Sequence, residues 1–91
     1  MDGCEPDQFL KRFGEAVRAR REALKVSQEE LAARCRLHRT YVAGVERGIR
    51  NPSLKSIKKL AEGLGLSLGA LFVRMGPAAK ASRGAKTARK G

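Results

Sequence analysis

Residues 27–48 read SQEELAARCRLHRTYVAGVERG and contain two short helical patterns separated by a very tight turn. The first pattern opens with a capping box, in which the Ser27 side chain accepts from the Glu30 amide and the Glu30 side chain reaches back. Only Arg36 to His38 separate the two patterns. So short a connection prevents an antiparallel pair and forces the helices to cross at roughly 90–120°. The stretch therefore predicts two steeply crossing helices.

The second pattern, residues 39–48, has a flat outward face. At 100° per residue, Val42 and Val45 fall on one side of the helix. The other side carries small residues between longer polar ones: Thr40, Ala43, Gly44 and Arg47, with Arg39 at its edge. A glycine at the centre of a helix costs ~1 kcal/mol relative to alanine. This shape indicates a helix that lies close against a large, anionic partner.

The chain is 91 residues long, which allows one domain with a small core. Its net charge of +11 is unevenly distributed. Residues 1–26 carry six basic and five acidic side chains, residues 27–75 carry nine and four, and residues 76–91 carry five and none. This excess points to nucleic acid or an anionic membrane as partner. A basic surface kept only for solubility usually shows a smaller imbalance.

Helical spacing of apolar residues recurs along the chain, and no segment alternates strictly between apolar and polar residues. We therefore expect five helices. The first begins near Pro6 and ends before Lys25, which occupies a turn position that favours a left-handed residue. Ser53 and Ser67 are the expected caps of the fourth and fifth helices. The chain then divides into three parts: a flexible N-terminus at 1–7, a helical domain at 8–75 and a disordered basic tail at 76–91.

The two cysteines and the single histidine do not predict a metal or catalytic site. Cys4 and Cys35 lie in different contexts, so a structural disulfide is not expected and a reducing cytoplasm is favoured. Cys35 and His38 have metal-ligand spacing, but four ligands are needed and only Cys4 could be added. A buried core thiol is the simpler interpretation of Cys35. Without a catalytic constellation or a phosphate-cradling glycine loop, we expect no enzyme, no cofactor and no small-molecule ligand.

The N-terminal stretch MDGCEPDQF is acidic and has no apolar run, so it does not resemble a signal peptide. The longest apolar stretch is far below the ~20 residues that span a bilayer. We therefore expect a soluble cytoplasmic protein, associated with the nucleoid if its partner is DNA.

Several residues together resemble the Cro/repressor-type (XRE) helix-turn-helix domain of bacteria and phages. They lie between residues 9 and 75: Ser27-Gln28, Leu31-Ala32, Val42, Val45, Glu46, Gly48, Asn51-Pro52 and Leu71-Phe72. The resemblance implies an all-α, five-helix lambda-repressor-like fold and a sequence-specific transcriptional regulator that binds double-stranded DNA. The block RTYVAGVERG looks closest to the controller proteins of restriction–modification systems, which are small homodimeric regulators.

The resemblance further implies that helix 39–48 enters the major groove of operator DNA. Arg39, at its first turn, is the candidate for a bidentate contact with guanine, and Thr40 for a base edge or a thymine methyl group. Ala43 and Gly44 let the helix settle close to the bases. The expected phosphate contacts come from three helices: Gln28, Tyr41, Arg47, Lys55 and Ser56. For each of these, an ordinary surface side chain is the competing interpretation.

The resemblance also assigns Arg21 and Glu46 to a structural pair that ties the first helix to the third. Two residues depart from the family pattern. His38 is a poor cap for the recognition helix, and Arg36 occupies a turn position where Gly or Asn is common, which favours a left-handed conformation. The basic tail is not part of the family domain. Its charge should strengthen DNA binding without adding sequence specificity, unless the tail serves only solubility.

A single recognition helix reads only a few base pairs, so we expect a homodimer that doubles the site. The fifth helix supplies the expected interface: Leu68, Leu71, Phe72 and Met75. For Leu68 and Leu71, packing inside one chain is the competing interpretation.

Two other classes of function stay open. An antitoxin-type regulator would also bind a partner toxin, and it would need an extension that folds on that toxin. A membrane-surface binder would need bulky apolar residues to insert. The basic tail offers neither, which favours a regulator that binds DNA and no membrane.

Overall fold

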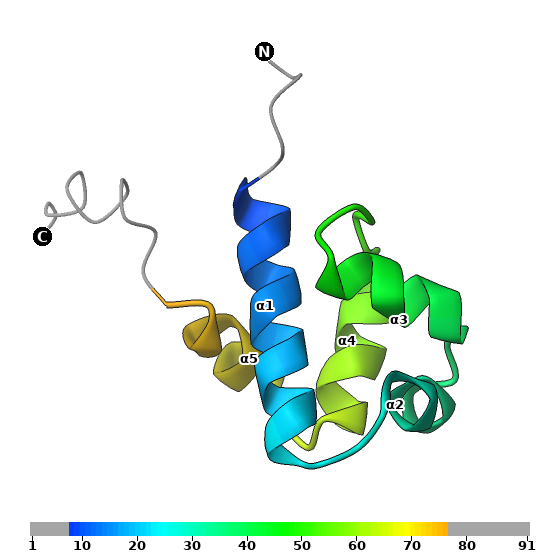
Figure 1. The fold of residues 1–91 in the computed structure, drawn as a ribbon. Coiled ribbons are helices and arrows are strands. Elements are labelled where there is room, and N and C mark those ends of the chain that lie inside the picture. The colour runs from blue at the N-terminus through cyan, green and yellow to red at the C-terminus, as the bar shows by residue number, and fades with distance from the viewer. Residues whose placement is uncertain (1–7, 77–91) are drawn as a thin grey trace, which may run out of the picture.

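The computed structural model describes residues 8–76, and every regular element within that range is a helix (Figure 1). The five helices are α1 (Gln8–Ala23), α2 (Gln28–Cys35), α3 (Arg39–Glu46), α4 (Leu54–Gly63) and α5 (Leu68–Arg74). The expected all-α fold of five helices is therefore confirmed. The N-terminus at 1–7, the helix start near Pro6 and the basic tail beyond Gly76 lie outside the described residues.

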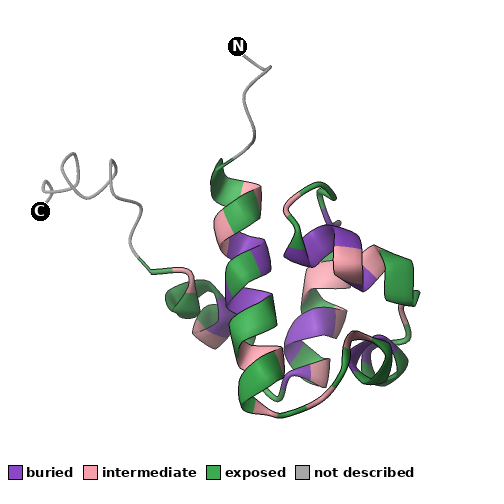
Figure 2. Cartoon of the chain, viewed as in Figure 1, coloured by how far each residue is buried: buried purple, intermediate pink, exposed green. Residues whose placement is uncertain are grey.

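The five helices enclose one core. α1 has α5 on one side and α3 on the other, while α2 packs against α3 and α4 (Figure 1). Buried residues lie on the sides of the helices that face one another (Figure 2). The largest fully buried side chains come from every helix and from the residue after α4: Val17, Leu31, Val42, Val45, Leu60, Leu64 and Leu71. Burying one such side chain contributes about 1.5–3 kcal/mol.

Serine side chains begin three of the helices, as the sequence predicts. The capping box at α2 is complete: the Glu30 amide donates to Ser27 Oγ at 3.0 Å, and the Ser27 amide donates to Glu30 Oε1 at 2.7 Å. Ser53 and Ser67 cap α4 and α5 through single hydrogen bonds of 3.1 and 3.0 Å. His38 makes no side-chain cap bond at α3. Because an orphan amide costs stability, α3 depends on its tertiary contacts for its start.

Within residues 8–76, two non-glycine residues have left-handed backbones, at the two positions where the sequence favours that conformation. Lys25 has a φ of 61° in the turn between α1 and α2, and Arg36 has a φ of 60° in the turn between α2 and α3. The Leu37 amide after Arg36 donates to the Ala32 carbonyl at 2.9 Å, which ends α2 sharply. A left-handed L-residue costs roughly 1–2 kcal/mol. That cost makes the tight turn a demanding part of the fold.

Two expectations about element boundaries and burial are wrong. The helix expected at 39–48 ends at Glu46, because Gly48 has a φ of 78° and its amide donates to the Val45 carbonyl. Leu71, expected at a dimer interface, is fully buried in the core of its own chain. The competing interpretation of Leu71 is the correct one. Leu68, in contrast, is an exposed residue.

Candidate nucleic-acid interface

The position of α3 is set first by its close approach to α1. Gly14 of α1 is buried, and a Cβ added there would lie 2.6 Å from the backbone oxygen of Glu46. Atoms this close would overlap, so only glycine permits the two backbones to meet here. The sequence alone does not indicate this role of Gly14, because it depends on a contact with a residue more than thirty positions away.

A network of hydrogen bonds then ties α3 to α1 and α2. Arg21 donates to both carboxylate oxygens of Glu46, at 2.6 Å from Nε and 3.1 Å from Nη2. Gln28 Nε2 donates to the same carboxylate at 2.9 Å, and Arg21 Nη1 donates to the Val26 carbonyl at 2.9 Å. The side chains of Arg21 and Glu46 are only 12% and 3% exposed. Hydrogen bonding to Glu46 raises the pKa of the Arg21 guanidinium.

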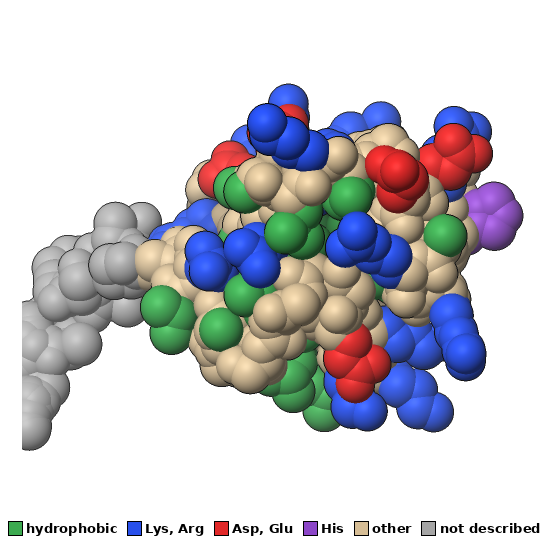
Figure 3. Space-filling model, turned by 90° about the horizontal axis from the view of Figure 1, so that it is seen from below, with side chains coloured by type: hydrophobic (Ala, Val, Ile, Leu, Met, Phe, Trp, Pro, Cys, Tyr) green, Lys and Arg blue, Asp and Glu red, His purple; other side chains and the backbone are tan. Residues whose placement is uncertain are grey.

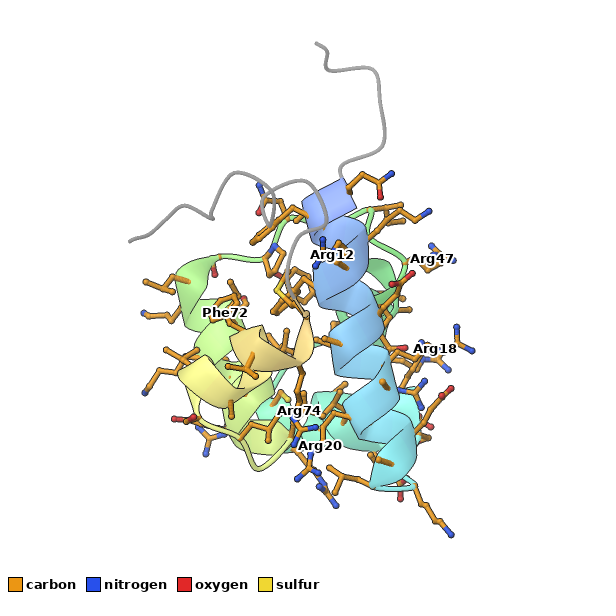
Figure 4. All side chains as sticks on the ribbon, turned by 90° about the vertical axis from the view of Figure 1, so that its left-hand side faces the viewer. Arg12, Arg18, Arg20, Arg47, Phe72 and Arg74 are labelled. Carbon is orange, nitrogen blue, oxygen red and sulfur yellow. The ribbon has the colours of Figure 1, made fainter. Side chains whose placement is uncertain are left out.

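The network changes the expected role of Gln28. This residue begins α2 and was expected at the DNA backbone, yet its amide nitrogen is engaged with Glu46. Gln28 and Arg47, two of the expected phosphate contacts, nevertheless line the same hollow of about 300 Å³ with Arg18. Figure 4 shows Arg18 and Arg47 projecting on the same side of α1. Cationic groups therefore meet at the junction of α1, α2 and α3.

The outward face of α3 differs from the helical projection at one position. Arg39 and Thr40 are exposed and Ala43 is half-buried, as a contact surface requires. Gly44 is buried instead of open, because the Arg50 side chain lies over it. A Cβ on Gly44 would stand 2.5 Å from Arg50 Cγ. The glycine thus admits an arginine side chain, and Gly44 itself is not free to meet a base in this structure.

Arg50 also stacks on Tyr41. Its guanidinium carbon lies 5.3 Å from the centre of the Tyr41 ring, within the range of a cation–π contact. Tyr41 is half-buried and packs against the core, so it provides a fixed platform. Arg50 is exposed and was not among the expected site residues. The available signal in the sequence was an arginine in the short loop after a helix that carries a tyrosine and a glycine.

The first turn of α4 carries the two remaining expected contacts. Lys55 is exposed, and Ser56 is half-buried with its amide bonded to Ser53 Oγ. Ser53 Oγ in turn lies 3.1 Å from Ser56 Oγ. The capped start of a helix favours anions, because its dipole is positive there. Lys55 adds a full charge to that end.

Cys35 is a buried free thiol in the core beside Gly63. Burial raises the pKa of this thiol. Within residues 8–76 no three His, Cys, Asp or Glu side chains are grouped to hold a metal ion. Of the helices in that range, none has the length and apolar character to cross a membrane.

An exposed, arginine-bearing helix fixed by its neighbours is the arrangement that helix-turn-helix proteins use to present a helix to DNA. The sequence profile of the helix-turn-helix family matches residues 17–71. The chain belongs to this XRE-type helix-turn-helix family. The predicted family is thereby confirmed, and the chain is a DNA-binding transcriptional regulator, not an enzyme.

Relatives within the family include control proteins of restriction–modification systems. Control protein C.BamHI of Bacillus amyloliquefaciens is 49% identical over 55 residues, which cover 59% of this chain and 68% of that protein. The crystal structure of the controller C.AhdI from Aeromonas hydrophila is similar with a TM-score of 0.71 at 47% identity. That match covers 72% of this chain and all of the other.

A second similar structure contains DNA. The controller C.Esp1396I bound to a 19 base pair duplex matches with a TM-score of 0.71 at 30% identity, over 76% of this chain and 92% of that one. Solved variants of C.Esp1396I replace an arginine, a threonine and a tyrosine that are consecutive in its chain.

Proposed function

We propose that this chain binds operator DNA as a homodimer and inserts α3 into the major groove of each half-site. The observation that carries the proposal is the exposed first turn of α3, where Arg39 and Thr40 project from a helix fixed by Arg21 and Glu46. A rigid helix with long donors at its first turn can place a fork of N–H groups on a base edge. The likeness to C.Esp1396I, which binds a duplex, supports this use of the surface.

Base recognition is assigned to Arg39 and Thr40, with Ala43 allowing close approach. The same three residue types that were replaced in C.Esp1396I stand here in the same order, as Arg39, Thr40 and Tyr41. An arginine at the positive end of a helix does not stabilise that helix. A role in binding guanine O6 and N7 accounts for its place there.

Phosphate contacts are assigned to cationic and hydroxyl groups around α3. Arg47, Lys55 and the half-buried Ser56 stand at the end of α3 and the start of α4. Arg50 joins them, since its guanidinium lies on the outward face of α3 against Tyr41. Such contacts fix orientation on the duplex without reading sequence. A regulator of this kind acts at the nucleoid in the cytoplasm.

The dimer is assigned to the exposed face of α5. Leu68 and Phe72 are each 37% exposed, and Val73 is 76% exposed. Phe72 rests against Phe13 with ring centres 6.0 Å apart, so it is held in place at the surface. Met75 packs partly on the core. A two-fold pair through this face would read half-sites about 10 base pairs apart or a multiple of that spacing.

The test compares Arg39→Ala with Arg74→Ala, a control that removes the same charge. Arg74 is exposed at the end of α5 near Arg20, on the face that Figure 4 turns toward the reader, away from α3. Arg39→Ala should lose about 1–3 kcal/mol on the operator and relax selectivity at one base position. Selection of bound duplexes from a random pool measures both effects. An unchanged selectivity profile for Arg39→Ala would refute base reading by α3.

A further inference from the structure

A second basic surface lies away from the outward face of α3, in a hollow between α2 and α4. The hollow has a volume of about 540 Å³. Five cationic side chains line it, together with one acid and a cysteine: Arg34, Arg36, Lys55, Lys58, Lys59, Glu62 and Cys35. Figure 3 shows Lys and Arg side chains gathered around one acidic group at an edge of the molecule.

The three lysines oppose the stability of the helix that carries them. Lys55, Lys58 and Lys59 are spaced i, i+3 and i+4, so their side chains lie on one face of α4. Like charges at this spacing repel. The first turn of α4 has no acidic residue, so the helix dipole adds to the repulsion. The spacing of the three lysines therefore does not stabilise α4.

The nearby acid compensates little of this charge. Glu62 Oε2 lies 3.3 Å from Lys58 Nζ, and both side chains are largely exposed. An exposed pair of this kind is weak. Arg34 has a structural use, because it donates to the Gly63 carbonyl at 3.3 Å from the last turn of α2. Lys55, Lys59 and Arg36 have no acid of the hollow other than Glu62 to balance them.

Arg36 is an unfavourable residue for its backbone conformation. Its φ is 60°, a conformation that glycine adopts without strain. Its side chain nevertheless lines the hollow. A cation placed at a strained position, beside lysines that repel it, fits a surface that receives an anion.

We propose that this hollow binds backbone phosphates of the duplex that flanks the operator half-site. The inference rests on the proposed function and adds a second contact region to it. Lys55 belongs both to the hollow and to the first turn of α4, which is assigned to the operator backbone. Arg36 precedes Arg39 by three residues. The hollow therefore shares Lys55 with the residues assigned to the operator backbone, and flanking DNA that bends toward α4 would place its next phosphates there.

The test uses the double variant Lys58→Gln/Lys59→Gln in the full chain, with two duplexes. One duplex ends at the operator boundary, and the other extends about ten base pairs further on each side, one helical turn. Wild type should bind the longer duplex more tightly, and the variant should lose that gain while binding the short duplex normally. Each phosphate contributes about 0.9 to the salt slope, so a fourfold rise in salt weakens binding about 3.5-fold per phosphate. On the longer duplex, the salt slope of the variant should therefore be smaller than that of wild type by the contribution of two phosphates per protomer.

Two matched variants control for charge and for folding. Lys25→Gln/Arg74→Gln removes the same charge from exposed sites outside the hollow, and it should keep the gain from flanking DNA. Lys58→Arg/Lys59→Arg keeps the charge and should also keep the gain. Thermal melting of all variants shows whether the fold is intact.

Several outcomes would overturn the assignment. If Lys58→Gln/Lys59→Gln keeps the full gain from flanking DNA, the hollow does not touch the duplex. If inorganic pyrophosphate shifts the amide resonances of Lys58 and Lys59 while that gain is unchanged, the phosphate source is a free ligand and not DNA. Failure of wild type to prefer the operator over a scrambled duplex would count against the proposed function itself.

Discussion

Arg21 donates two hydrogen bonds to Glu46, and through them α1 fixes the last turn of the helix that carries Arg39. Both side chains are withdrawn from solvent. Gln28 donates a third bond to the same carboxylate. The recognition helix is short and lacks a side-chain cap, so its orientation depends on this network and on the close backbone contact at Gly14.

Removing one partner of this buried pair should strongly destabilise the fold. We expect Glu46→Ala to lower the free energy of unfolding by about 3–5 kcal/mol, because the largely buried Arg21 and Gln28 would lose the carboxylate to which they donate. Within residues 8–76, only Glu22, at 3.9 Å, would remain as an acidic neighbour of Arg21. Arg18→Ala breaks the exposed pair of Arg18 with Glu22, at 3.0 Å, and should cost less than about 1 kcal/mol. Urea denaturation of both variants measures the difference. Equal losses of unfolding free energy in the two variants would show that the buried pair stabilises the fold no more than the exposed pair does.

Local signals made much of this fold predictable. The capping box at Ser27, the caps at Ser53 and Ser67, and the left-handed Arg36 each depend on a few neighbouring residues, and all are present. The position of Gly44 was not predictable in the same way. A helical projection gives a direction for each residue but does not show that the following loop returns Arg50 across that face.

Long-range contacts explain why the sequence did not predict the roles of Gly14, Gly63 and Leu71. Gly14 and Gly63 are required because chain segments distant in sequence pass within van der Waals distance of them. Neither requirement leaves a pattern in its own helix. Leu71 shows the same limit, since apolar spacing along α5 could not distinguish its buried face from its exposed one.

Arg50 should contribute to DNA binding through its stacking on Tyr41. Because Arg50 is assigned to a phosphate contact, Arg50→Ala should weaken operator binding by about 1.5–3 kcal/mol, the range for a hydrogen bond to a charged group. Tyr41→Leu should weaken it less, by about 0.5–1 kcal/mol, since it removes only the stacking that positions the side chain. Tyr41→Phe keeps the ring and controls for the loss of the hydroxyl group. Titrations with labelled operator measure all three, and normal binding by Arg50→Ala would remove Arg50 from the interface.

The packing of Gly63 against Cys35 should appear as coupling between the two sites. A Cβ on Gly63 would overlap Cys35 Sγ in the core, so Gly63→Ala should cost about 1–3 kcal/mol by overpacking. Cys35→Ala creates space at the same point. The double variant should therefore be more stable than the sum of the two single losses indicates. Simple additivity in denaturant titrations would mean that the overlap is relieved elsewhere.

The buried Cys35 thiol should make stability fall at alkaline pH. Burial raises the pKa of this thiol in the folded state, so the folded chain keeps a proton that the unfolded chain loses above about pH 8.5. The contribution is complete below that pH and is lost as pH rises toward the folded pKa. Comparing unfolding free energies of wild type and Cys35→Ala between pH 7 and 10 isolates it from other titrating groups. Parallel curves for the two proteins would contradict the prediction.

Val73 is the most informative residue for the proposed dimer, because it is exposed on α5 and contributes little to the core. Val73→Glu would place a charge in an apolar interface, where desolvation is costly. We expect the dissociation constant of the dimer to rise at least about tenfold, equivalent to roughly 1.4 kcal/mol, with no loss of helical content. Leu54→Glu is the matched control, since Leu54 is 72% exposed but lies at the start of α4. Equilibrium sedimentation without DNA separates the two cases. If Val73→Glu stays as dimeric as wild type while Leu54→Glu dissociates, the interface lies on α4 and not on α5.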